Sequence, residues 1–354
     1  MRIVKLIVCI LFFAICAFFS LGTLITGSSV ITEGGIEKPS LITETGVNRN
    51  FGNEYEEYFS RAFAYRRYVV DAWSALRVNL LSEGNDQVVV GKNGFLFFAE
   101  TVDAYTGLDP MTDEEIVKAA DSLLALQNYS EERGAKFCFL IAPDKNTIYP
   151  ENMPKRYIKA KTTDLDRLSD ALTERGVSFV DPRETLSSAK PTTNVYYKTD
   201  THWTPDGAEL AFSLVAERLG IEMFDTSSLD RIEESLQGDL DTLLYPGQTL
   251  TESVEVSDFS ESFIYTSAYS TPMDMVITSR GRGSGKALVF RDSFCNALLG
   301  LISSTFSETQ FERANPFRLD LLETSKADFV IVEIAERNLR NLIDCDERIK
   351  EVID

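Results

Sequence analysis

The chain contains a single histidine, and its neighbours have a spacing suited to proton transfer. His202 follows Asp200 by two residues, in the segment Asp-Thr-His-Trp-Thr-Pro. In an extended segment, residues i and i+2 project to the same side, roughly 6.5 Å apart along the chain, so the Asp200 carboxylate can reach an imidazole nitrogen. The dipole of a helix starting at Pro205 disfavours an imidazolium, whereas Asp200 favours it. These opposed effects suit a general base, although a structural histidine beside a helix cap has the same neighbours.

Ser293 is the best candidate for the group that such a base activates. It lies between an apolar strand expected at 287–290 and a helix expected at 294–306. This context places its hydroxyl at the C-terminal edge of a sheet, where open α/β folds bind ligands, beside free N–H groups that can stabilise an oxyanion. The alternative is that Asp292 or Ser293 only caps the helix. The GxSxG elbow of α/β-hydrolases is absent.

Composition excludes several other kinds of site. One histidine cannot supply a zinc site of the two- or three-histidine type. Beyond the N-terminal segment, Cys138, Cys295 and Cys345 are too widely spaced for a metal knuckle. A net charge of −20 argues against binding to the phosphates of nucleic acids. We therefore predict no metal, no other cofactor and no nucleic-acid partner.

The N-terminus has the composition of a membrane anchor. After Arg2 and Lys5, the stretch 6–25 is apolar, without charge and 20 residues long, enough to span ~30 Å of hydrocarbon. We interpret residues 1–26 as an uncleaved single-pass anchor in the cell membrane; a cleaved signal peptide or a buried soluble helix remains an alternative. The basic end should stay inside, so the chain beyond it, with a charge of −22, would be extracytoplasmic.

The elements that must position these residues follow from the pattern beyond the anchor. Residues 27–50 are rich in Gly, Ser and Thr and predict a tether, and 51–354 a catalytic domain interrupted by a polar, partly β insertion at about 221–286. One long helix is expected at 55–81 and two short strands within 88–98. Further helices are expected at 112–133, 163–175, 205–219, 294–306 and 337–352, and further strands at 136–142, 177–181, 287–290 and 327–334. This alternation predicts an α/β fold whose mostly parallel sheet is covered on both faces.

The motifs around the two candidate residues resemble those of a known family. The segments 200–203 (Asp-Thr-His-Trp) and 290–294 (Phe-Arg-Asp-Ser-Phe), with further matches at 91–97, 142–150 and 327–337, resemble the DHHW family. Its members are SGNH-hydrolase-like proteins related to the alginate O-acetylation proteins of bacteria. The name DHHW spells a four-residue motif, and this chain departs from it at Thr201, where the motif has a histidine. That position is not the one expected to act as the base.

The resemblance implies a fold and a mechanism. The fold would be an SGNH-hydrolase-like, flavodoxin-like three-layer sandwich. Ser293 would be the nucleophile, His202 the general base and Asp200 the residue that orients the imidazole. Asp200 and His202 precede Ser293, which is a permuted order of the blocks of ordinary SGNH hydrolases. The Gly and Asn that help the oxyanion hole in those enzymes have no clear counterpart in this sequence.

The resemblance also implies a function and partners. The chain would transfer acetyl groups to hydroxyls of a cell-surface or secreted polysaccharide through an acetyl-serine, outside the cytoplasmic membrane. A membrane-bound O-acyltransferase would supply the acetyl groups. Two alternatives stay open: a polysaccharide acetylesterase, and a non-catalytic glycan-binding or assembly subunit.

A second set of residues is predicted, less directly, to contact substrate. Each has a common structural alternative: Trp203 packs beside the helix start, Lys145 is an exposed loop lysine, and Arg337 forms a solvated ion pair. Tyr197 shares the ambiguity of Trp203. Arg291 either holds Asp292 or faces the pocket. The expected substrate-binding residues are Trp203, Tyr197, Lys145, Arg291 and Arg337.

Overall fold

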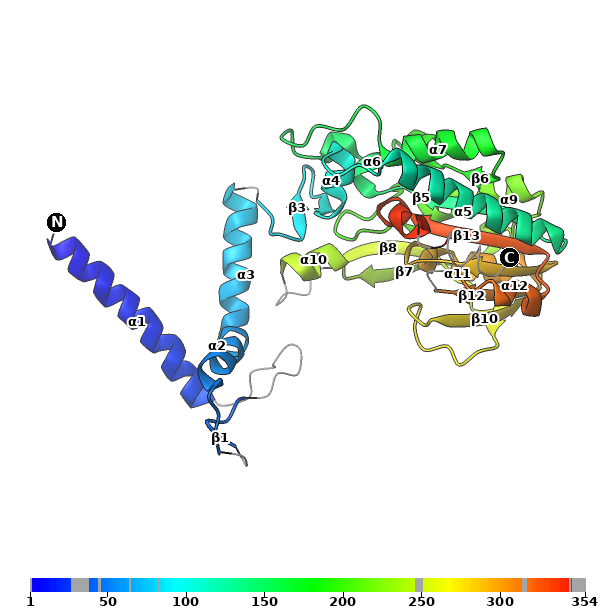
Figure 1. Ribbon diagram of the computed structural model, residues 1–354. Helices are drawn as coiled ribbons and strands as arrows, with labels where there is room; N and C mark the ends of the chain where they lie inside the picture. The colour runs from blue at the N-terminus through cyan, green and yellow to red at the C-terminus, as the bar shows by residue number, and fades with distance from the viewer. Residues whose placement is uncertain are drawn as a thin grey trace. The chain divides into compact units, whose positions relative to one another are not determined.

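The structure, a computed structural model, forms two compact units (Figure 1). It describes residues 2–26, 38–43, 46–63, 65–81, 83–245, 251–313, 317–343 and 345. The first unit comprises Met1–Leu81 with Tyr245–Gln248, and the second Ser82–Leu244 with Thr249–Asp354. The division after Leu81 falls within the range that we assigned to the catalytic domain, so the domain boundaries stay a prediction. Residues 27–37 and 44–45 of the expected tether lie outside the described residues.

The first unit is helical. Its elements are α1 (Arg2–Thr26), β1 (Ile42–Thr43), β2 (Gly46–Val47), α2 (Phe51–Ala62), α3 (Arg66–Leu76) and the π-helical turn η2 (Arg77–Leu81). The prediction of a single long helix over 55–81 is wrong, because the structure has separate helices in this range. Tyr65 adopts a left-handed conformation with φ of 65°, which interrupts the helical path between α2 and α3.

Helix α1 is long and apolar enough to cross a membrane. The qualifying stretch is Lys5–Gly22, whose side chains are not buried within the structure. A signal sequence satisfies the same criteria of length and composition. The helix therefore supports a membrane-spanning segment at the N-terminus, and whether it is retained stays a prediction.

The second unit is built on a seven-stranded sheet. The strand order is β6 (Phe179–Val180), β5 (Lys136–Ala142), β13 (Phe329–Ala335), β11 (Lys286–Phe290), β12 (Glu308–Glu312), β10 (Val276–Gly281) and β9 (Phe263–Tyr265). The pairs from β6 to β12 are parallel, and β10 and β9 add antiparallel strands at one edge. The predicted mostly parallel sheet is confirmed. Strand β12 was not predicted; its sequence, Glu-Thr-Gln-Phe-Glu, lacks a continuous apolar run.

Helices cover both faces of this sheet, as the alternation predicted (Figure 1). Successive residues of β5 alternate between two hydrophobic cores. One core lies against α5 (Asp113–Glu132) and α7 (Asp164–Arg175). The other lies against α9 (Pro205–Leu219), η5 (Phe294–Leu298) and α11 (Leu299–Thr305). The shorter elements are β3 (Val88–Val90), β4 (Leu96–Phe98), α4 (Thr101–Thr106), α6 (Lys145–Ile148), η3 (Pro150–Asn152), α8 (Arg183–Ala189), η4 (Thr226–Ser228), α10 (Asp239–Leu244), α12 (Asp320–Ser325) and η6 (Glu336–Leu342).

Capping residues in the sequence predicted where helices begin. The helices expected in the C-terminal part of the chain were predicted less accurately. Thr112 closes a capping box at α5, and the Thr204 hydroxyl accepts the Gly207 N–H at the start of α9. The helix expected at 294–306 is divided into the 3-10 turn η5 and the α-helix α11. The helix expected from 337 begins as the 3-10 helix η6, and residues 346–352 lie outside the described residues.

The range 221–286 combines a hairpin with the edge of the main sheet. Strands β7 (Arg231–Leu236) and β8 (Glu252–Ser257) pair with each other in antiparallel register. Strands β9 and β10 of the same range instead join the seven-stranded sheet. Residues 246–250, between α10 and β8, lie outside the described residues. The expectation of a partly β insertion thus matches the strands that the structure describes.

Candidate active site

The imidazole of His202 connects the two predicted motifs. Its Nε2 lies 2.9 Å from the Ser293 hydroxyl, and its Nδ1 lies 2.7 Å from Asp200 Oδ1. Ser293 follows β11, whereas Asp200 and His202 lie in the extended segment before α9. The parallel sheet brings the end of β11 to this segment, which is 91 residues away in sequence. The arrangement has the geometry of a Ser-His-Asp relay.

The Asp200 carboxylate is fixed by further hydrogen bonds. Its Oδ1 also accepts the backbone N–H of His202 at 2.9 Å, and its Oδ2 accepts the N–H of Asp239 at 3.0 Å. Burial raises the pKa of Asp200, but the hydrogen bonds and charge of its partners, chiefly His202, bring it below its usual value. A carboxylate that stays ionised can hold the imidazole in one orientation and stabilise its protonated form.

Asp239 is a member of this network that the sequence did not indicate. Its carboxylate accepts the Thr201 N–H at 2.8 Å and the Thr201 hydroxyl at 2.6 Å, and lies 3.8 Å from His202 Nδ1. Among the described residues, Asp200, His202 and Asp239 are a group close enough to share a metal ion. The two carboxylates and His202 Nδ1 already take part in hydrogen bonds with protein groups. These hydrogen bonds explain why the three side chains lie so close together. Asp239 lies in the polar insertion, where no local motif marks it.

Lys145 is buried beneath the catalytic segment and is not an exposed loop lysine. Its ammonium donates hydrogen bonds to the carbonyl oxygens of Tyr197, Lys198 and Asp200, at 3.1, 3.0 and 2.7 Å. Burial lowers the pKa of Lys145 to about 7, against the opposing effect of Asp200 and other acidic groups. Its contacts hold the backbone that carries the relay, and burial leaves Lys145 little surface for contact with substrate.

The turn that carries Ser293 is held by two carboxylates. Asp292 accepts the N–H of Phe294 at 2.9 Å and that of Ala335 at 2.8 Å. Glu333 accepts the N–H groups of Asp292 and Cys295 at 3.2 and 3.1 Å. Burial raises the pKa of Glu333 well above its usual value. A side-chain cap on this turn therefore exists, but Asp292 makes it, which leaves the Ser293 hydroxyl to His202.

The expectation of several free N–H groups beside Ser293 is only partly met. Phe294 and Cys295 donate to carboxylates, and Asn296 donates its N–H to the Ser293 carbonyl at 3.1 Å. Within the described residues, the N–H of Ser293 itself has no protein acceptor. One backbone donor thus remains available next to the nucleophile.

Trp203 is fully buried and packs against the nucleophile turn. Its indole N–H donates to the Phe294 carbonyl at 2.8 Å, and the two rings meet edge to face. Trp203 therefore packs beside the start of the helix, which is the structural alternative to substrate contact given above. Tyr197 is half-buried, and it lines the pocket at the relay.

Both predicted arginines are engaged with protein groups. Arg291 is buried and donates to the carbonyls of Pro272 and Asp274 and to Asn296 Oδ1, at 2.7, 3.1 and 2.8 Å. It therefore does not face the pocket. Arg337 lies 3.3 Å from the buried Asp144 carboxylate, and its guanidinium stacks 4.9 Å from the Phe294 ring centre.

A pocket of about 510 Å³ opens at the relay. Asp200, His202 and Ser293 lie in its wall. The remaining lining residues come mainly from α9, the β7–β8 hairpin, η5 and α11: Tyr197, Trp203, Pro205, Glu209, Glu234, Leu236, Val256, Ser257, Phe259, Pro272, Phe294, Asn296, Ala297, Gly300 and Leu301. The insertion thus supplies one wall of the candidate site, a contribution that its sequence did not indicate.

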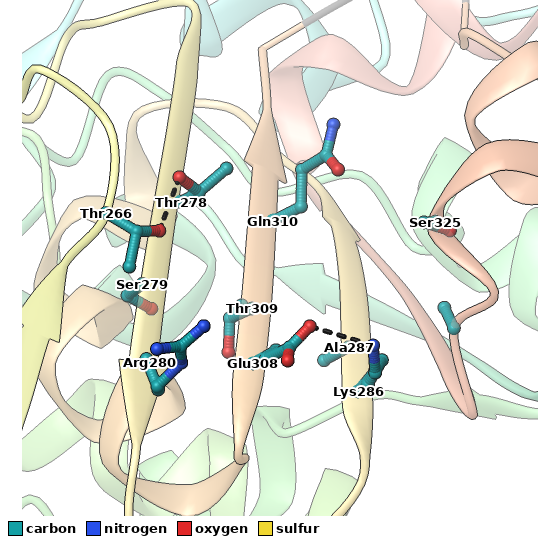
Figure 2. Close-up of a pocket in the computed structure, with 11 residues that line it drawn as sticks. Thr266, Thr278, Ser279, Arg280, Lys286, Ala287, Glu308, Thr309, Gln310 and Ser325 are labelled. Carbon is teal, nitrogen blue, oxygen red and sulfur yellow. Dashed lines mark hydrogen bonds and ion pairs between the residues drawn. The ribbon is translucent and has the colours of Figure 1, made fainter.

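A smaller pocket of about 160 Å³ lies at the opposite edge of the sheet (Figure 2). Lys286 and Glu308, at the beginnings of β11 and β12, form an ion pair of 2.9 Å across it. Thr266 and Thr278 are joined by a hydrogen bond of 2.7 Å on neighbouring strands. Ser293 follows the other end of β11, so this pocket takes no part in the relay.

The parallel sheet, its two helical layers and a serine at the carboxyl edge define an SGNH-hydrolase-like α/β protein. Comparison with known proteins agrees. A family model described as the SGNH hydrolase-like domain of the acetyltransferase AlgX matches residues 88–261. This match includes Asp200 and His202 and ends before Ser293.

Curated relatives extend the resemblance. The chain is 30% identical over 196 residues to the probable alginate O-acetylase AlgJ of Pseudomonas aeruginosa, covering 52% of this chain and 45% of the relative. It is 29% identical over 212 residues to the protein of the same name from Pseudomonas syringae pv. tomato, covering 58% and 51%. The chain spans about half the length of these relatives. The resemblance to the alginate O-acetylation proteins predicted from the sequence is confirmed.

Solved structures share the fold. PatB1 of Bacillus cereus superposes with a TM-score of 0.54 at 15% identity, covering 72% of this chain and 97% of PatB1. A DHHW family protein from Eubacterium siraeum superposes with a TM-score of 0.50 at 15% identity, covering 64% and 88%. The predicted SGNH-hydrolase-like fold is confirmed. At this level of identity the likeness concerns the fold alone.

Proposed function

We propose that this protein is a membrane-anchored, extracytoplasmic O-acetyltransferase that acetylates hydroxyl groups of a polysaccharide through an acetyl-serine. The observation that carries the proposal is the hydrogen-bonded series from Ser293 through His202 to Asp200, which opens into the 510 Å³ pocket. Ser293 is the nucleophile, His202 the general base and Asp200 the orienting carboxylate. The named relatives support acetyl transfer as the reaction.

In the first half-reaction, Ser293 Oγ attacks the carbonyl carbon of an acetyl donor and its proton moves to His202 Nε2. The tetrahedral intermediate then loses the donor's leaving group, which takes that proton. An acetyl ester on Ser293 remains. In the second half-reaction, a sugar hydroxyl gives its proton to Nε2 and attacks the ester. Ser293 Oγ leaves with that proton, so the enzyme is restored.

The Ser293 N–H is the proposed donor to the oxyanion. It adjoins the nucleophile and has no protein acceptor within the described residues. The Asn296 side chain lines the same pocket, and Arg291 donates to its Oδ1 at 2.8 Å. Its NH₂ group donates one N–H to Met273 Sδ at 3.6 Å, which leaves the other N–H for an acceptor in the pocket. We assign that amide as a second donor. A preorganised donor at a developing oxyanion contributes roughly 3–4 kcal/mol in enzymes of this mechanism.

The membrane arrangement is part of the proposal. Helix α1, if retained, would hold the catalytic unit outside the cytoplasmic membrane, with Arg2 and Lys5 inside. A membrane-bound O-acyltransferase then delivers acetyl groups to the pocket. The supporting observation is the apolar N-terminal helix, which brings the protein to the bilayer in which such a partner lies.

Mass spectrometry of the full chain tests the proposal. The protein in detergent is mixed with an activated acetyl ester and digested at low pH. We expect one added acetyl group on the peptide that contains Ser293, and none in Ser293→Ala. The matched control is Ser303→Ala, a buried serine in α11 whose hydroxyl bonds Ser279. A folded wild-type protein that gains no acetyl group would contradict the proposal.

Adding oligosaccharides to the same reaction separates transfer from hydrolysis. Transfer predicts an alkali-labile acetyl ester on the sugar and loss of the acetyl group from Ser293. Release of acetate alone, at the same rate with and without sugar, would favour an acetylesterase.

A further inference from the structure

The pocket at the relay continues into a second hollow, and together they form a groove. The second pocket has a volume of about 370 Å³. Its lining shares seven residues with the first: Glu234, Val256, Ser257, Phe259, Pro272, Asn296 and Gly300. We call the combined surface the acceptor groove. It runs along the β7–β8 hairpin and reaches Ser293 at one end.

Apart from the relay's imidazole, the acidic and basic side chains that line the acceptor groove are all carboxylic acids. Its acidic lining residues are Asp200, Glu209, Glu234 and Asp258, and no lysine or arginine is among the lining residues that the structure describes. Glu234 is exposed on β7, and Asp258 follows β8. A cleft lined by charges of one sign concentrates their potential and repels ligands of the same sign.

The cations near this groove are turned away from it. Arg291 is buried behind Pro272 and Asn296, where its guanidinium bonds protein carbonyls and an amide. Lys145 is buried behind Asp200 and bonds three backbone carbonyls. Arg231 lies on the other side of the β7–β8 hairpin, paired with Asp206 at 2.9 Å. None of these groups lines the groove to offer an ion pair to a carboxylate.

Aromatic rings line the end of the groove that lies away from Ser293. The half-buried side chains of Phe263, Tyr265 and Tyr269 lie there, and the two tyrosine rings stack at 3.9 Å. Phe259 lines both pockets, where they join. Aromatic faces pack against the apolar faces of sugar rings, and phenolic hydroxyls add hydrogen bonds. This lining suits recognition of pyranose rings by shape and hydrogen bonding.

From these observations we infer that the acceptor is a glycan without anionic groups, composed of neutral or amino-bearing sugars, and not a polyuronate. The inference rests on the proposed acetyl transfer and specifies its substrate class. It separates this chain from the activity printed in the names of its relatives, because alginate is a polymer of uronic acids. A uronate in the groove would set its carboxylate beside Glu234 and Asp258 with no cation to balance it.

The test compares acceptors of equal length that differ in charge. The full chain in detergent, with an activated acetyl ester as donor, is given oligomers of glucose, of glucosamine or of a uronic acid, at low salt. We expect the glucose and glucosamine oligomers to receive O-acetyl groups at least ~10-fold faster than the uronate, a ratio that corresponds to about 1.4 kcal/mol. Equal or faster transfer to the uronate would overturn the inference.

A matched pair of variants shows whether the groove's charge sets the preference. Glu234→Gln removes a charge from the groove, whereas Glu233→Gln removes one from the adjacent residue of β7, which is not among the lining residues and bonds Ser253. We expect Glu234→Gln to narrow the gap between uronate and glucose oligomers roughly 2- to 3-fold, and high salt to do the same. An unchanged ratio in Glu234→Gln, or an equal change in Glu233→Gln, would contradict the inference.

The acetyl-serine measurement keeps the two proposals separate. If Ser293 gains no acetyl group, the proposed function fails before any acceptor is involved. If the acetyl-serine forms but only water accepts its acetyl group, the protein acts as an esterase. The charge preference is then measured as the rate at which acetate is released from acetylated neutral oligomers and from acetylated uronate oligomers. Faster release from the uronate would then overturn the inference.

Discussion

His202 Nε2 and Ser293 Oγ lie 2.9 Å apart although 91 residues separate them in the chain. The end of β11 and the extended segment before α9 meet at the carboxyl edge of the sheet, so two short motifs become one site. Trp203 links these two segments by a hydrogen bond, because its indole N–H donates to the carbonyl of Phe294, the residue after Ser293.

Replacing His202 should abolish acetyl transfer. The chain has one histidine, so no second imidazole can take the proton from Ser293. For His202→Gln, which keeps a polar side chain of similar length, we expect acetyl-serine formation to slow by at least ~10³-fold. Stopped-flow release of the donor's leaving group measures the rate. A variant that is folded and keeps a tenth of the wild-type rate would exclude His202 as the base.

Lys145 should act by positioning the relay. Lys145→Met removes the donor to the carbonyls of Tyr197, Lys198 and Asp200, and the loosened segment misplaces His202. We expect kcat to fall roughly 10- to 100-fold with KM for the activated ester little changed. Lys198→Met, which changes an exposed lysine of the same segment, serves as control. A rise in KM at constant kcat would instead indicate contact with substrate.

Replacing Trp203 should mainly lower stability, whereas replacing Tyr197 should mainly weaken binding of the oligosaccharide. Trp203 is fully buried, so Trp203→Ala should lower the free energy of unfolding by about 3–5 kcal/mol. Tyr197 lines the pocket and is half-buried, so Tyr197→Ala should destabilise less and raise KM for the oligosaccharide. Urea unfolding and acceptor kinetics measure the two effects. The assignment of Trp203 to packing would be wrong if Trp203→Ala were as stable as the wild type.

Buried acidic groups should make the protein less stable as the pH rises from about 4.5 to 7. Burial raises the pKa of Glu336 from 4.5 to about 7, with Asp144 adding to the effect. The folded state thus binds more protons than the unfolded state in this window, so the stability present below the unfolded pKa is lost as the pH rises. The change corresponds to at most roughly 3–4 kcal/mol, at about 1.4 kcal/mol per tenfold change in proton affinity.

Glu336→Gln should flatten this pH dependence. Thermal or urea unfolding at pH 5 and pH 8 measures the difference, and Glu217→Gln, a change on the exposed side of α9, is the control. Equal pH dependence in Glu336→Gln and the wild type would show that Glu336 does not titrate in this window.

Local sequence determined four of the five parallel strands, the starts of α5, α7 and α9, and the first two members of the relay. Thr204 before Pro205 predicts the start of α9, and the apolar run at 136–142 predicts β5, because capping and hydrophobic periodicity act between near neighbours. Asp200 and His202 are two residues apart, so their contact also follows from the geometry of an extended segment.

Only the tertiary structure decided which groups surround that pair. Asp239 bonds Thr201 from 38 residues away, and Lys145 bonds the Asp200 carbonyl from 55 residues away. The acidic groove likewise depends on how the β7–β8 hairpin lies beside η5 and α11. These contacts arise from packing between distant segments, and no local pattern of charge or hydrophobicity specifies which distant partner a side chain meets. The relay's histidine was therefore identifiable from the sequence, whereas its supports and the charge of its groove were not.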